Sequence, residues 1–388
     1  MNAPPPPNAP PAPNAPHPDA DLHDLARRHA AEADRTARLP EPVRAALLRS
    51  DVISLPVPAA YGGPETDPVA SFARVAALAA ADASTAWYAA VSASAALTAW
   101  SLPPEAAHKI WGRGPVLVAG TRRVGGLATA DGAGGGVILT EGRWQWGSAA
   151  RDADWITVGA RDDTGRELLL TVERAAFHVN DDWQAIGLRA TASGTFRLAG
   201  PVRVPAALCR PLDDAAAPAH RPGPLGRFAA PAYTSGLFCA VALGNARGAV
   251  EEFEERARTT RRLATDATLA ATDHVRRAHA RALVACEAAE ALALRTLADA
   301  WDDTVRGRAL APVAAARTRA ALAHATEVAR DTVDACLRLV GSSGVRLDSP
   351  LQRRQRDATV LTAHHYLGER HIADYGRARL HPTEEPDA

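Results

Sequence analysis

Residues 135–149 read GGVILTEGRWQWGSA, in which side chains of different polarity alternate after a glycine turn, a pattern typical of a β-strand. The alternation predicts that Trp144 and Trp146 lie on one face of the strand, and at least one of them is expected to anchor a core. Similar short segments, separated by glycine, Asp-Asp and Thr-Gly turns, fill residues 114–211. This region is therefore predicted to form a small antiparallel β-barrel or sandwich.

Helix-favouring sequence lies on both sides of the β region. Residues 21–113 are predicted to form an N-terminal helical domain, and the alanine-rich residues 212–388 a C-terminal four-helix bundle. The last bundle helix is expected over about 351–378, and Gly341 is expected to cap the helix before it. Residues 1–20 are rich in proline and are predicted to be a disordered, solvated tail. The predicted fold class is thus α+β.

Composition excludes several classes of function. The chain has 388 residues, 44 basic and 44 acidic, so it lacks the excess of positive charge that nucleic-acid binding requires. No run of roughly 18 apolar residues and no signal-peptide pattern occurs, so neither a membrane nor a secreted location is expected. The four cysteines are widely spaced, which favours a reduced, cytoplasmic protein. Lys109 is the only lysine and stands in an ordinary helical turn, so Schiff-base chemistry is not expected.

The common cofactor and metal signatures are missing or incomplete. Residues 126–137, GLATADGAGGGV, fail the dinucleotide-binding pattern because Val137 stands where its last glycine belongs. Among the 13 histidines, His364, His365 and His371 form the densest group. On one helix His364 and His371 would lie about 10 Å apart, too far for one ion to bridge. No metal site is therefore predicted.

Five segments carry a more specific signal because they occur in a fixed order along the chain. They are PAAYGGP (58–64), AADASTAW (80–87), GRWQWGSAARDADW (142–155), DDWQAIGLRATASGTFRLAGPVRVP (181–205) and SPLQRRQRDATVLTAHH (349–365). In this order, over about residues 22–378, they resemble the acyl-CoA dehydrogenase fold and in particular its two-component flavin-dependent monooxygenases. The Y-E-G sequence that often accompanies the glutamate base of the dehydrogenases is absent, and residues 363–376 read AHHYLGERHIADYG instead.

This resemblance implies a reduced-flavin-dependent hydroxylase acting on a small aromatic, polycyclic or amine substrate through a flavin C4a-(hydro)peroxide. Reduced FMN or FAD would come from a separate NAD(P)H:flavin reductase, O2 would be the co-substrate, and the chain would form a homo-oligomer, expected to be a tetramer. Two alternatives remain open, namely a flavin dehydrogenase or desaturase and a non-catalytic scaffold of the same fold. The choice between FMN and FAD and between C- and N-oxidation also remains open.

The resemblance also assigns roles to individual residues. His364 is the expected catalytic residue, as a base or as a hydrogen-bond donor. His365 is expected to face away from it, about 100° further round the same helix. The implied cofactor-binding residues are Ser148, Trp155, Trp183, Thr191, Ser193, Arg261 and Gly341, and the implied substrate-pocket residues are Trp87, Ala90 and Ser94. Ala149 departs from the family pattern, which often has glycine after the serine, so a different turn is expected there.

Overall fold

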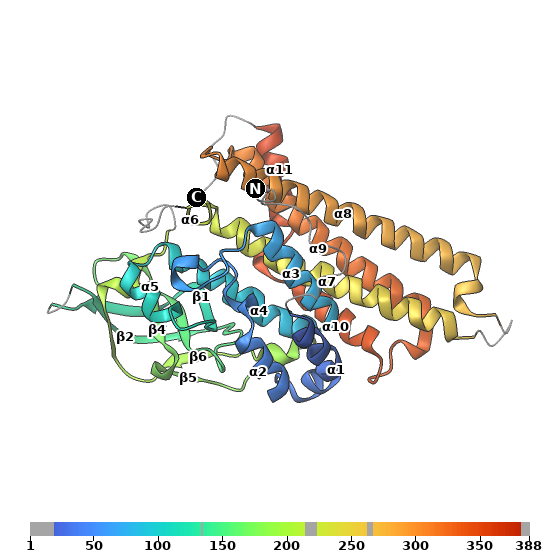
Figure 1. Cartoon of the computed structure of the whole chain (residues 1–388), viewed down its shortest axis with the longest axis horizontal. Helices are drawn as coiled ribbons and strands as arrows, with labels where there is room; N and C mark the ends of the chain where they lie inside the picture. Colours follow the sequence, from blue (N-terminus) through green and yellow to red (C-terminus); the bar gives the residue numbers. More distant parts are fainter. Residues whose placement is uncertain (1–18, 133–134, 214–222, 262–266, 382–388) are drawn as a thin grey trace, which may run out of the picture.

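The structure is a computed structural model that describes residues 19–132, 135–213, 223–261 and 267–381. Its strands lie at one end of the molecule and its long helices extend from the other (Figure 1). All but the last two residues of the predicted proline-rich tail lie outside the described ranges. The described order of helices, strands and helices confirms the predicted α+β fold, while the exact domain boundaries stay predictions.

The N-terminal part is a layer of helices between the sheet and the bundle. Its helices are α1 (Ala20–Thr36), α2 (Glu41–Arg49), α3 (Pro68–Ala81), α4 (Ala83–Ala96) and α5 (Pro104–Trp111). The break between α3 and α4 falls at Asp82, whose backbone is extended and whose carboxylate accepts the N–H of Thr85 at 2.8 Å. This cap starts α4 in a new direction, because it satisfies an N–H that has no partner within the helix. α4 continues into the 3-10 turn η3 (Leu97–Trp100).

The described residues of the central part form one sheet of eight strands. They are β1 (Val118–Ala130), β2 (Val137–Trp144), β3 (Trp155–Asp162), β4 (Glu167–Glu173), β5 (Phe177–Val179), β6 (Phe196–Leu198), β7 (Val202–Val204) and β8 (Cys209–Pro211). The order is β5-β6-β2-β1-β3-β4-β8, with β7 beside β2. All the other strand pairs are antiparallel, as predicted for this region, whereas β1 and β3 pair in parallel. The cause is a crossover: after β2 the chain passes to the other side of β1, and residues 145–154 make this connection.

The two tryptophans of the opening segment have different environments. Strand β2 ends at Trp144, which is 1% exposed, packs against Phe196 at 5.4 Å between ring centroids and donates its indole N–H to the Gly159 carbonyl. Trp146 has a backbone φ of 65° and is 61% exposed. The left-handed backbone of Trp146 ends the two-residue alternation. The prediction that both rings share one face was therefore wrong. Trp144 is the expected core anchor.

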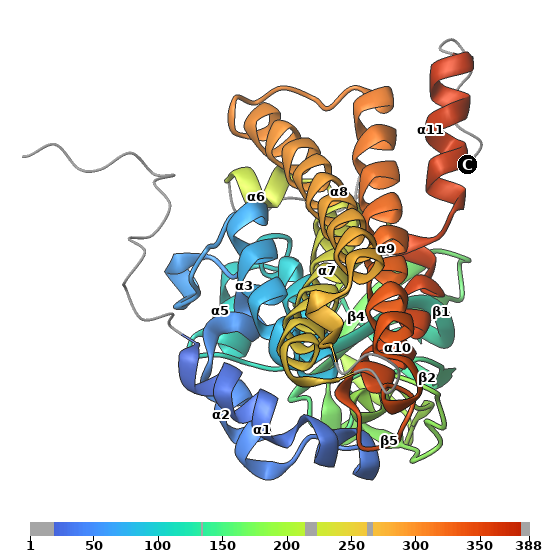
Figure 2. The same cartoon turned by 90° about the vertical axis from the view of Figure 1, so that its right-hand side faces the viewer.

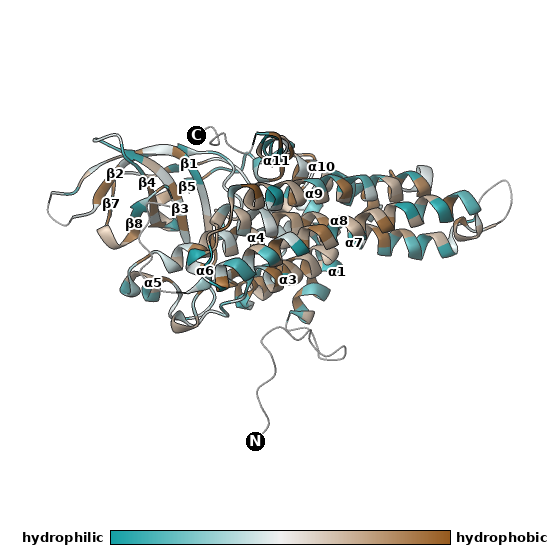
Figure 3. Cartoon of the chain, turned by 90° about the horizontal axis from the view of Figure 1, so that it is seen from above, coloured by the Kyte–Doolittle hydropathy of each residue, from teal (hydrophilic) through white to brown (hydrophobic). Residues whose placement is uncertain are grey.

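The C-terminal part is a bundle of long helices. Its helices are the short α6 (Pro224–Arg227), then α7 (Ala230–Thr259), α8 (Asp273–Val305), α9 (Pro312–Val340), α10 (Pro350–Thr362) and α11 (Arg370–Leu380). α7 packs against both α3 and α9, which joins the bundle to the N-terminal layer. Figure 3 shows hydrophobic residues on these packed helices and more hydrophilic ones along α8. The described helices include none long and apolar enough to cross a bilayer.

Close approach of α3 and α7 depends on glycine. A Cβ on Gly244 would stand 2.2 Å from the Ala76 carbonyl oxygen, and one on Gly248 would stand 2.5 Å from the Ala80 carbonyl oxygen. Because these atoms belong to the backbone, a side chain would force the helices apart. The alanine-rich and glycine-containing sequence of α7 is thus explained by helix packing.

The last helix is interrupted, contrary to the prediction of one helix over 351–378. α10 ends at Thr362, the 3-10 turn η10 (His365–Leu367) follows, and α11 then packs on α9 in a new direction (Figure 2). The His364 ring Nδ1 accepts the N–H of Tyr366 at 3.4 Å and caps the turn. The expected cap at Gly341 is confirmed, with φ 75° directly after α9.

Candidate active site

A cavity of about 1220 Å³ lies where α4, β1, the start of α7 and the residues after α10 meet. Seven of the residues singled out in the sequence line it: Trp87, Ser94, Ser148, Trp183, Thr191, Ser193 and His364. They come from four separate parts of the chain, so the fold brings together side chains that the sequence only suggested by resemblance. This cavity is the candidate active site.

Four other residues singled out in the sequence do not line this cavity. Ala90 is fully buried on α4, and Trp155 is buried on β3 with the Lys109 ammonium 5.1 Å from its ring centroid. Arg261 pairs with Thr268 just after α7, which ends about 30 Å along its axis from the cavity at 1.5 Å per residue. Gly341 follows α9 and is likewise absent from the lining. Within one chain, these four therefore have no contact with the cavity.

A chain of hydrogen bonds runs along one wall of the cavity. The Trp87 indole N–H donates to Ser148 Oγ at 3.1 Å, Ser148 and Ser193 lie 2.6 Å apart, and Ser193 lies 2.7 Å from Thr191. Thr191 donates its proton to the Leu188 carbonyl at 2.7 Å. Because Thr191 has used its only proton, Ser193 must donate to Thr191 and Ser148 to Ser193. Trp87 and the Leu188 carbonyl thus orient all three hydroxyl groups in one direction.

The backbone beside these hydroxyl groups adopts an uncommon conformation. Trp146, Ala149, Leu188 and Ala192 have φ between 47° and 65°, and they are four of the six non-glycine residues with positive φ in the described chain. Such residues cost free energy and concentrate at functional sites. Ala149 adopts the left-handed conformation that glycine favours, so alanine occupies a backbone position suited to glycine.

This conformation makes a prediction about Ala149. Replacing it with glycine removes the left-handed strain but also a buried methyl group, so we expect the free energy of unfolding to change by less than about 0.5 kcal/mol. Ala150 is equally buried but has no positive φ. Ala150→Gly is expected to cost about 1–2 kcal/mol. Urea denaturation of both variants measures the difference, and equal losses would contradict the strain at Ala149.

Helix α10 holds the loop that carries Thr191 and Ser193. Gly187 packs on its backbone so closely that a Cβ would stand 2.2 Å from the Arg356 carbonyl oxygen. The next N–H, that of Leu188, donates to Asp357 Oδ1 at 2.6 Å. Burial raises the pKa of Asp357 to about 7, although the Leu188 hydrogen bond opposes the shift. A buried carboxyl group of the bundle therefore fixes the loop of the sheet region.

The raised pKa of Asp357 makes stability depend on pH. The folded state binds the proton more tightly than the unfolded state, so this contribution is complete below pH 4 and is lost as pH rises through about 7. Between pH 5 and 8 the loss should reach about 2.5 kcal/mol. Asp357→Asn keeps the carbonyl acceptor but cannot titrate, so its unfolding free energy should lack this decline. Denaturation at several pH values tests this, and parallel profiles for the two proteins would refute it.

His364 faces the cavity at the end of α10. Its ring meets those of Trp87 and Phe238 edge-on, with centroids 5.3 Å and 4.8 Å away. Burial, with a smaller effect of His365, lowers the pKa of His364 to about 3, so the ring is neutral at physiological pH. Because Nδ1 accepts the Tyr366 N–H, the proton is on Nε2. His364 therefore offers an N–H donor rather than a positive charge.

His365 does not face away from the cavity as expected. It lines the same cavity, and its ring centroid lies 4.8 Å from that of His364. The expectation rested on a continuous helix, in which neighbours differ by 100°, whereas the chain here turns into η10. His365 is therefore no control for His364.

Among the aromatic residues of the cavity, Trp146 was expected only as a possible core anchor, and Phe238 and Tyr366 were not singled out in the sequence. The exposed Trp146 meets Trp183 at 5.7 Å, Phe238 stacks on Trp87 at 4.4 Å, and Tyr366 lies beside His364. Trp146 had a usable signal, since it stands two residues before Ser148. Phe238 is one of many apolar residues in α7, and nothing in its local sequence marks it.

The donors and walls of this cavity fit a flavin ring system. Small hydroxyl groups stand beside two partly exposed tryptophans, and the further aromatic rings of Trp87 and Phe238 line the same cavity. A planar heterocycle with polar edges needs such a combination of hydrogen-bonding groups and flat apolar surfaces. The described residues contain no group of three or more histidine, cysteine or acidic side chains arranged to hold a metal ion.

Two family models match the chain on either side of the sheet. Residues 22–103 match the acyl-CoA dehydrogenase N-terminal domain and residues 236–369 the acyl-CoA dehydrogenase C-terminal domain. The chain belongs to the acyl-CoA dehydrogenase family. Within this family it falls in the flavin-dependent monooxygenase branch, as its individual relatives indicate.

The relatives of this family member match it over most of its length. Indole-3-acetate monooxygenase of Pseudomonas putida is 26% identical, covering 88% of the chain and 87% of the relative. The flavin-dependent monooxygenase oxygenase subunit HsaA of Mycobacterium tuberculosis is 27% identical, covering 87% and 88%. Among solved structures, XiaF from Streptomyces in complex with FADH2 superposes with a TM-score of 0.86 at 25% identity, covering 95% of this chain and 97% of XiaF.

Proposed function

We propose that this monooxygenase is the oxygenase component of a two-component system that hydroxylates an aromatic substrate. Reduced FMN or FAD would arrive from a separate NAD(P)H:flavin reductase, and O2 would supply the oxygen atom. The relatives support this proposal, since they include an oxygenase subunit and the FADH2-dependent oxygenase component of a resorcinol hydroxylase. The cytoplasmic location expected from the sequence remains part of the proposal.

The observation that carries the proposal is the presence of two polar groups at one end of an aromatic cavity. The oriented hydroxyl chain of Ser148, Ser193 and Thr191 and the neutral His364 both line the cavity, and Trp87 contacts both Ser148 and His364. Both are positioned by the fold before any ligand arrives. The hydroxyl protons are all used within this chain, so its oxygens offer acceptor lone pairs. The Nε2–H of His364 is a preorganised donor, and such a donor stabilises charge on oxygen without a cost of reorganisation.

Each group of residues in the cavity has a separate role in the proposed reaction. Ser148, Thr191 and Ser193 would hold the polar edge of the flavin, and Trp146 and Trp183 would cover its ring. When bound, reduced flavin supplies the two electrons that reduce O2, so that one oxygen atom enters the substrate and the other leaves as water. The Nε2–H of His364 would donate a hydrogen bond to the oxygen being transferred or to a substrate hydroxyl group. Trp87 and Phe238 would exclude water, which limits wasteful release of hydrogen peroxide.

A dehydrogenase on the same fold is less well supported. Removing a proton from a saturated carbon requires a base beside the flavin. The described residues that line the cavity include one carboxylate, Asp213, and it lies beside Arg210 rather than among the hydroxyl groups. His364, with a pKa of about 3, is a weak base. These features favour oxygen transfer over desaturation.

The decisive experiment combines the purified chain with FMN or FAD, a generic NADH:flavin reductase and a panel of aromatic and amine compounds under air. The proposal expects a product one oxygen atom heavier than its substrate. It also expects no NADH oxidation by the chain and flavin alone, since no nucleotide-binding element was found in the sequence. Anaerobic reduction of bound flavin by a substrate would instead establish the dehydrogenase.

The proposed assembly is a homo-oligomer, with a tetramer as the specific expectation. On α8, Val284 and Leu292 are 62% and 39% exposed and stand eight residues apart, so they share one face of the helix. Covering this face with another copy would remove apolar surface from water. Light scattering at micromolar concentration should therefore give a multiple of 40.7 kDa. A mass equal to one chain would refute the assembly.

A further inference from the structure

The cavity is elongated and has a second end with a different chemistry. Its lining follows α4 and η3 from Trp87 to Trp100, a distance of about 20 Å at 1.5 Å per residue. It also follows α7 back from Phe238 to Ala230, about 12 Å. The hydroxyl chain and His364 lie at the Trp87 end, because Trp87 contacts both Ser148 and His364. The other end is formed by η3, α6 and the start of α7.

Arginine dominates the charge of this cavity. Its described lining contains four arginines, Arg122, Arg123, Arg210 and Arg227, against one carboxylate, that of Asp213. The two histidines in the lining add no positive charge, because burial lowers the pKa of both rings. A cavity with low-dielectric walls and an excess of guanidinium groups attracts anions.

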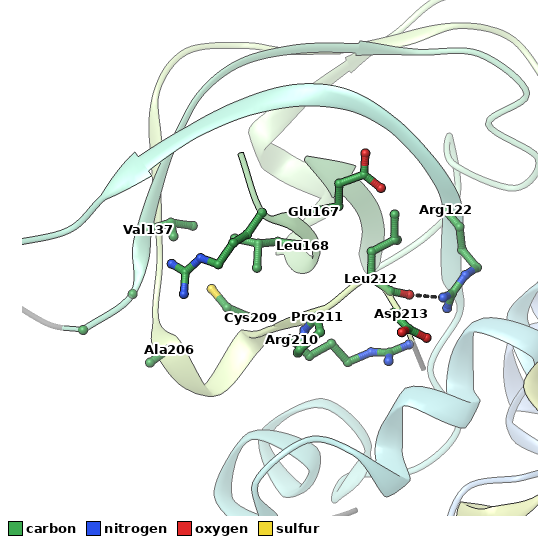
Figure 4. A pocket seen from close by; sticks show the side chains of 13 residues that line it. Arg122, Val137, Glu167, Leu168, Ala206, Cys209, Arg210, Pro211, Leu212 and Asp213 are labelled. Carbon is green, nitrogen blue, oxygen red and sulfur yellow. Dashed lines mark hydrogen bonds between the residues drawn. The ribbon is translucent and has the colours of Figure 1, made fainter. Parts of the chain in front are cut away.

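Arg210 is the least exposed of these arginines, with 8% of its surface accessible. It sits on β8, paired with Leu169 of β4, so its backbone is fixed by the sheet. Figure 4 shows its side chain beside Asp213 and near Arg122, whose guanidinium donates to the Leu212 carbonyl. Arg122, Arg210 and Asp213 also line a second cavity of about 860 Å³ on the other side. These three residues therefore form the partition between the two cavities.

The start of α7 adds to the positive potential of this end. Residues 229–231 line the cavity, and the N-cap, Ala229, has no side chain that could accept a hydrogen bond from the first turn. The N-terminus of a 30-residue helix carries a partial positive charge from its aligned peptide dipoles. Arg227, in α6 directly before it, also lines the cavity, and its exposed guanidinium donates to the Thr304 carbonyl of α8.

We propose that this arginine end binds the carboxylate of an anionic aromatic substrate, whose ring reaches the hydroxyl chain and His364. The inference rests on the proposed function and adds the class of its substrate, an aromatic ring joined by a flexible spacer to an oxyanion. The phosphate of FMN is a second oxyanion of similar chemistry. The arginine end begins about 12 Å along α7 from Phe238, beside which the ring would react, and titration with FMN and riboflavin distinguishes the two oxyanions.

The test measures binding and does not require turnover. Calorimetry with the full chain compares indole-3-acetate, indole-3-propionate and indole-3-butyrate with their neutral amides, which have the same shape. At least one carboxylate should bind ten or more times more tightly than its amide, and longer spacers should bind best. Arg210→Gln should reduce this preference to less than threefold while leaving the affinity for the amides unchanged. If the Arg210 variant fails to fold, Arg227→Gln replaces it, because Arg227 is exposed. This variant should likewise reduce the preference for carboxylates over amides.

The matched control is Arg166→Gln. Arg166 lines only the second cavity and is already paired with Asp162 at 2.8 Å, so the preference for carboxylates should persist. Titration with FMN and riboflavin separates the two oxyanions: if Arg210→Gln abolishes a preference for FMN over riboflavin, the arginines hold the cofactor phosphate and the proposal is overturned. Equal affinity for every acid and its amide also overturns it, whatever the outcome of the oxygen-insertion assay. Tight carboxylate binding without oxygen insertion would instead refute only the proposed function.

Discussion

Replacing His364 with alanine is expected to lower the rate of product formation by about 10²–10³-fold while the protein still folds and binds flavin. The ring is the neutral donor at the hydroxyl-lined end of the cavity, and its loss leaves the transferred oxygen without that hydrogen bond. Flavin oxidation should continue, so hydrogen peroxide should replace product. The ratio of product to peroxide per NADH consumed measures this change.

The conservative variant separates catalysis from packing. Glutamine at position 364 retains an N–H donor near the place of the ring Nε2. The ratio of product to hydrogen peroxide should therefore be higher in His364→Gln than in His364→Ala. His371, which is buried and does not line the cavity, is the control: His371→Ala should lower the melting temperature and leave coupling unchanged. Because the pKa of His364 is about 3, the effect of its removal should be equal at pH 6 and pH 8. If His364→Ala gives the same ratio of product to hydrogen peroxide as the unaltered protein, His364 has only a structural role.

Replacing Gly187 with alanine is expected to cost about 3–5 kcal/mol of unfolding free energy, because the new methyl group meets backbone that cannot rotate away. The added Cβ would lie 2.2 Å from the Arg356 carbonyl oxygen and 2.6 Å from the Asp357 nitrogen. Relieving the overlap requires the loop to leave α10, which breaks the Leu188 hydrogen bond to the buried Asp357. Flavin affinity should fall as well, since the same loop carries Thr191 and Ser193.

A second glycine of the sheet region provides the comparison. Gly200 has open space where its Cβ would stand and no positive φ, so Gly200→Ala should change stability by less than about 0.5 kcal/mol. Thermal and urea denaturation of both variants, with flavin titration, give the result. If Gly187→Ala is as stable as Gly200→Ala, the loop is not held by contact with α10, and another cause must fix Thr191 and Ser193.

Much of the local structure was predictable because its cause lies within a few residues. The two-residue alternation predicts β2 up to Trp144, and the glycine after Val340 predicts the end of α9. Ser148, Thr191 and Ser193 could be singled out because each belongs to a short motif within one turn or loop. The resemblance also indicated His364, although it placed the residue on a helix that ends at Thr362.

The remaining features depend on contacts between residues far apart in the chain. The Trp87 bond to Ser148 spans 61 residues and the Leu188 bond to Asp357 spans 169, so no local pattern contains them. The parallel pairing of β1 with β3 arises from a crossover that hydrophobic alternation does not encode.

The sequence by itself therefore determined the order of helices and strands, the class of chemistry and most of the hydroxyl-lined wall. Tertiary structure decided which side chains share the cavity: Phe238 on Trp87, His365 beside His364, and four arginines from β1, β8 and α6 in the lining. The physical reason is that side-chain periodicity records which face of an element is buried, whereas packing decides what that face meets. The charge of the cavity, and with it the proposed anionic substrate, was decided by packing and not by side-chain periodicity.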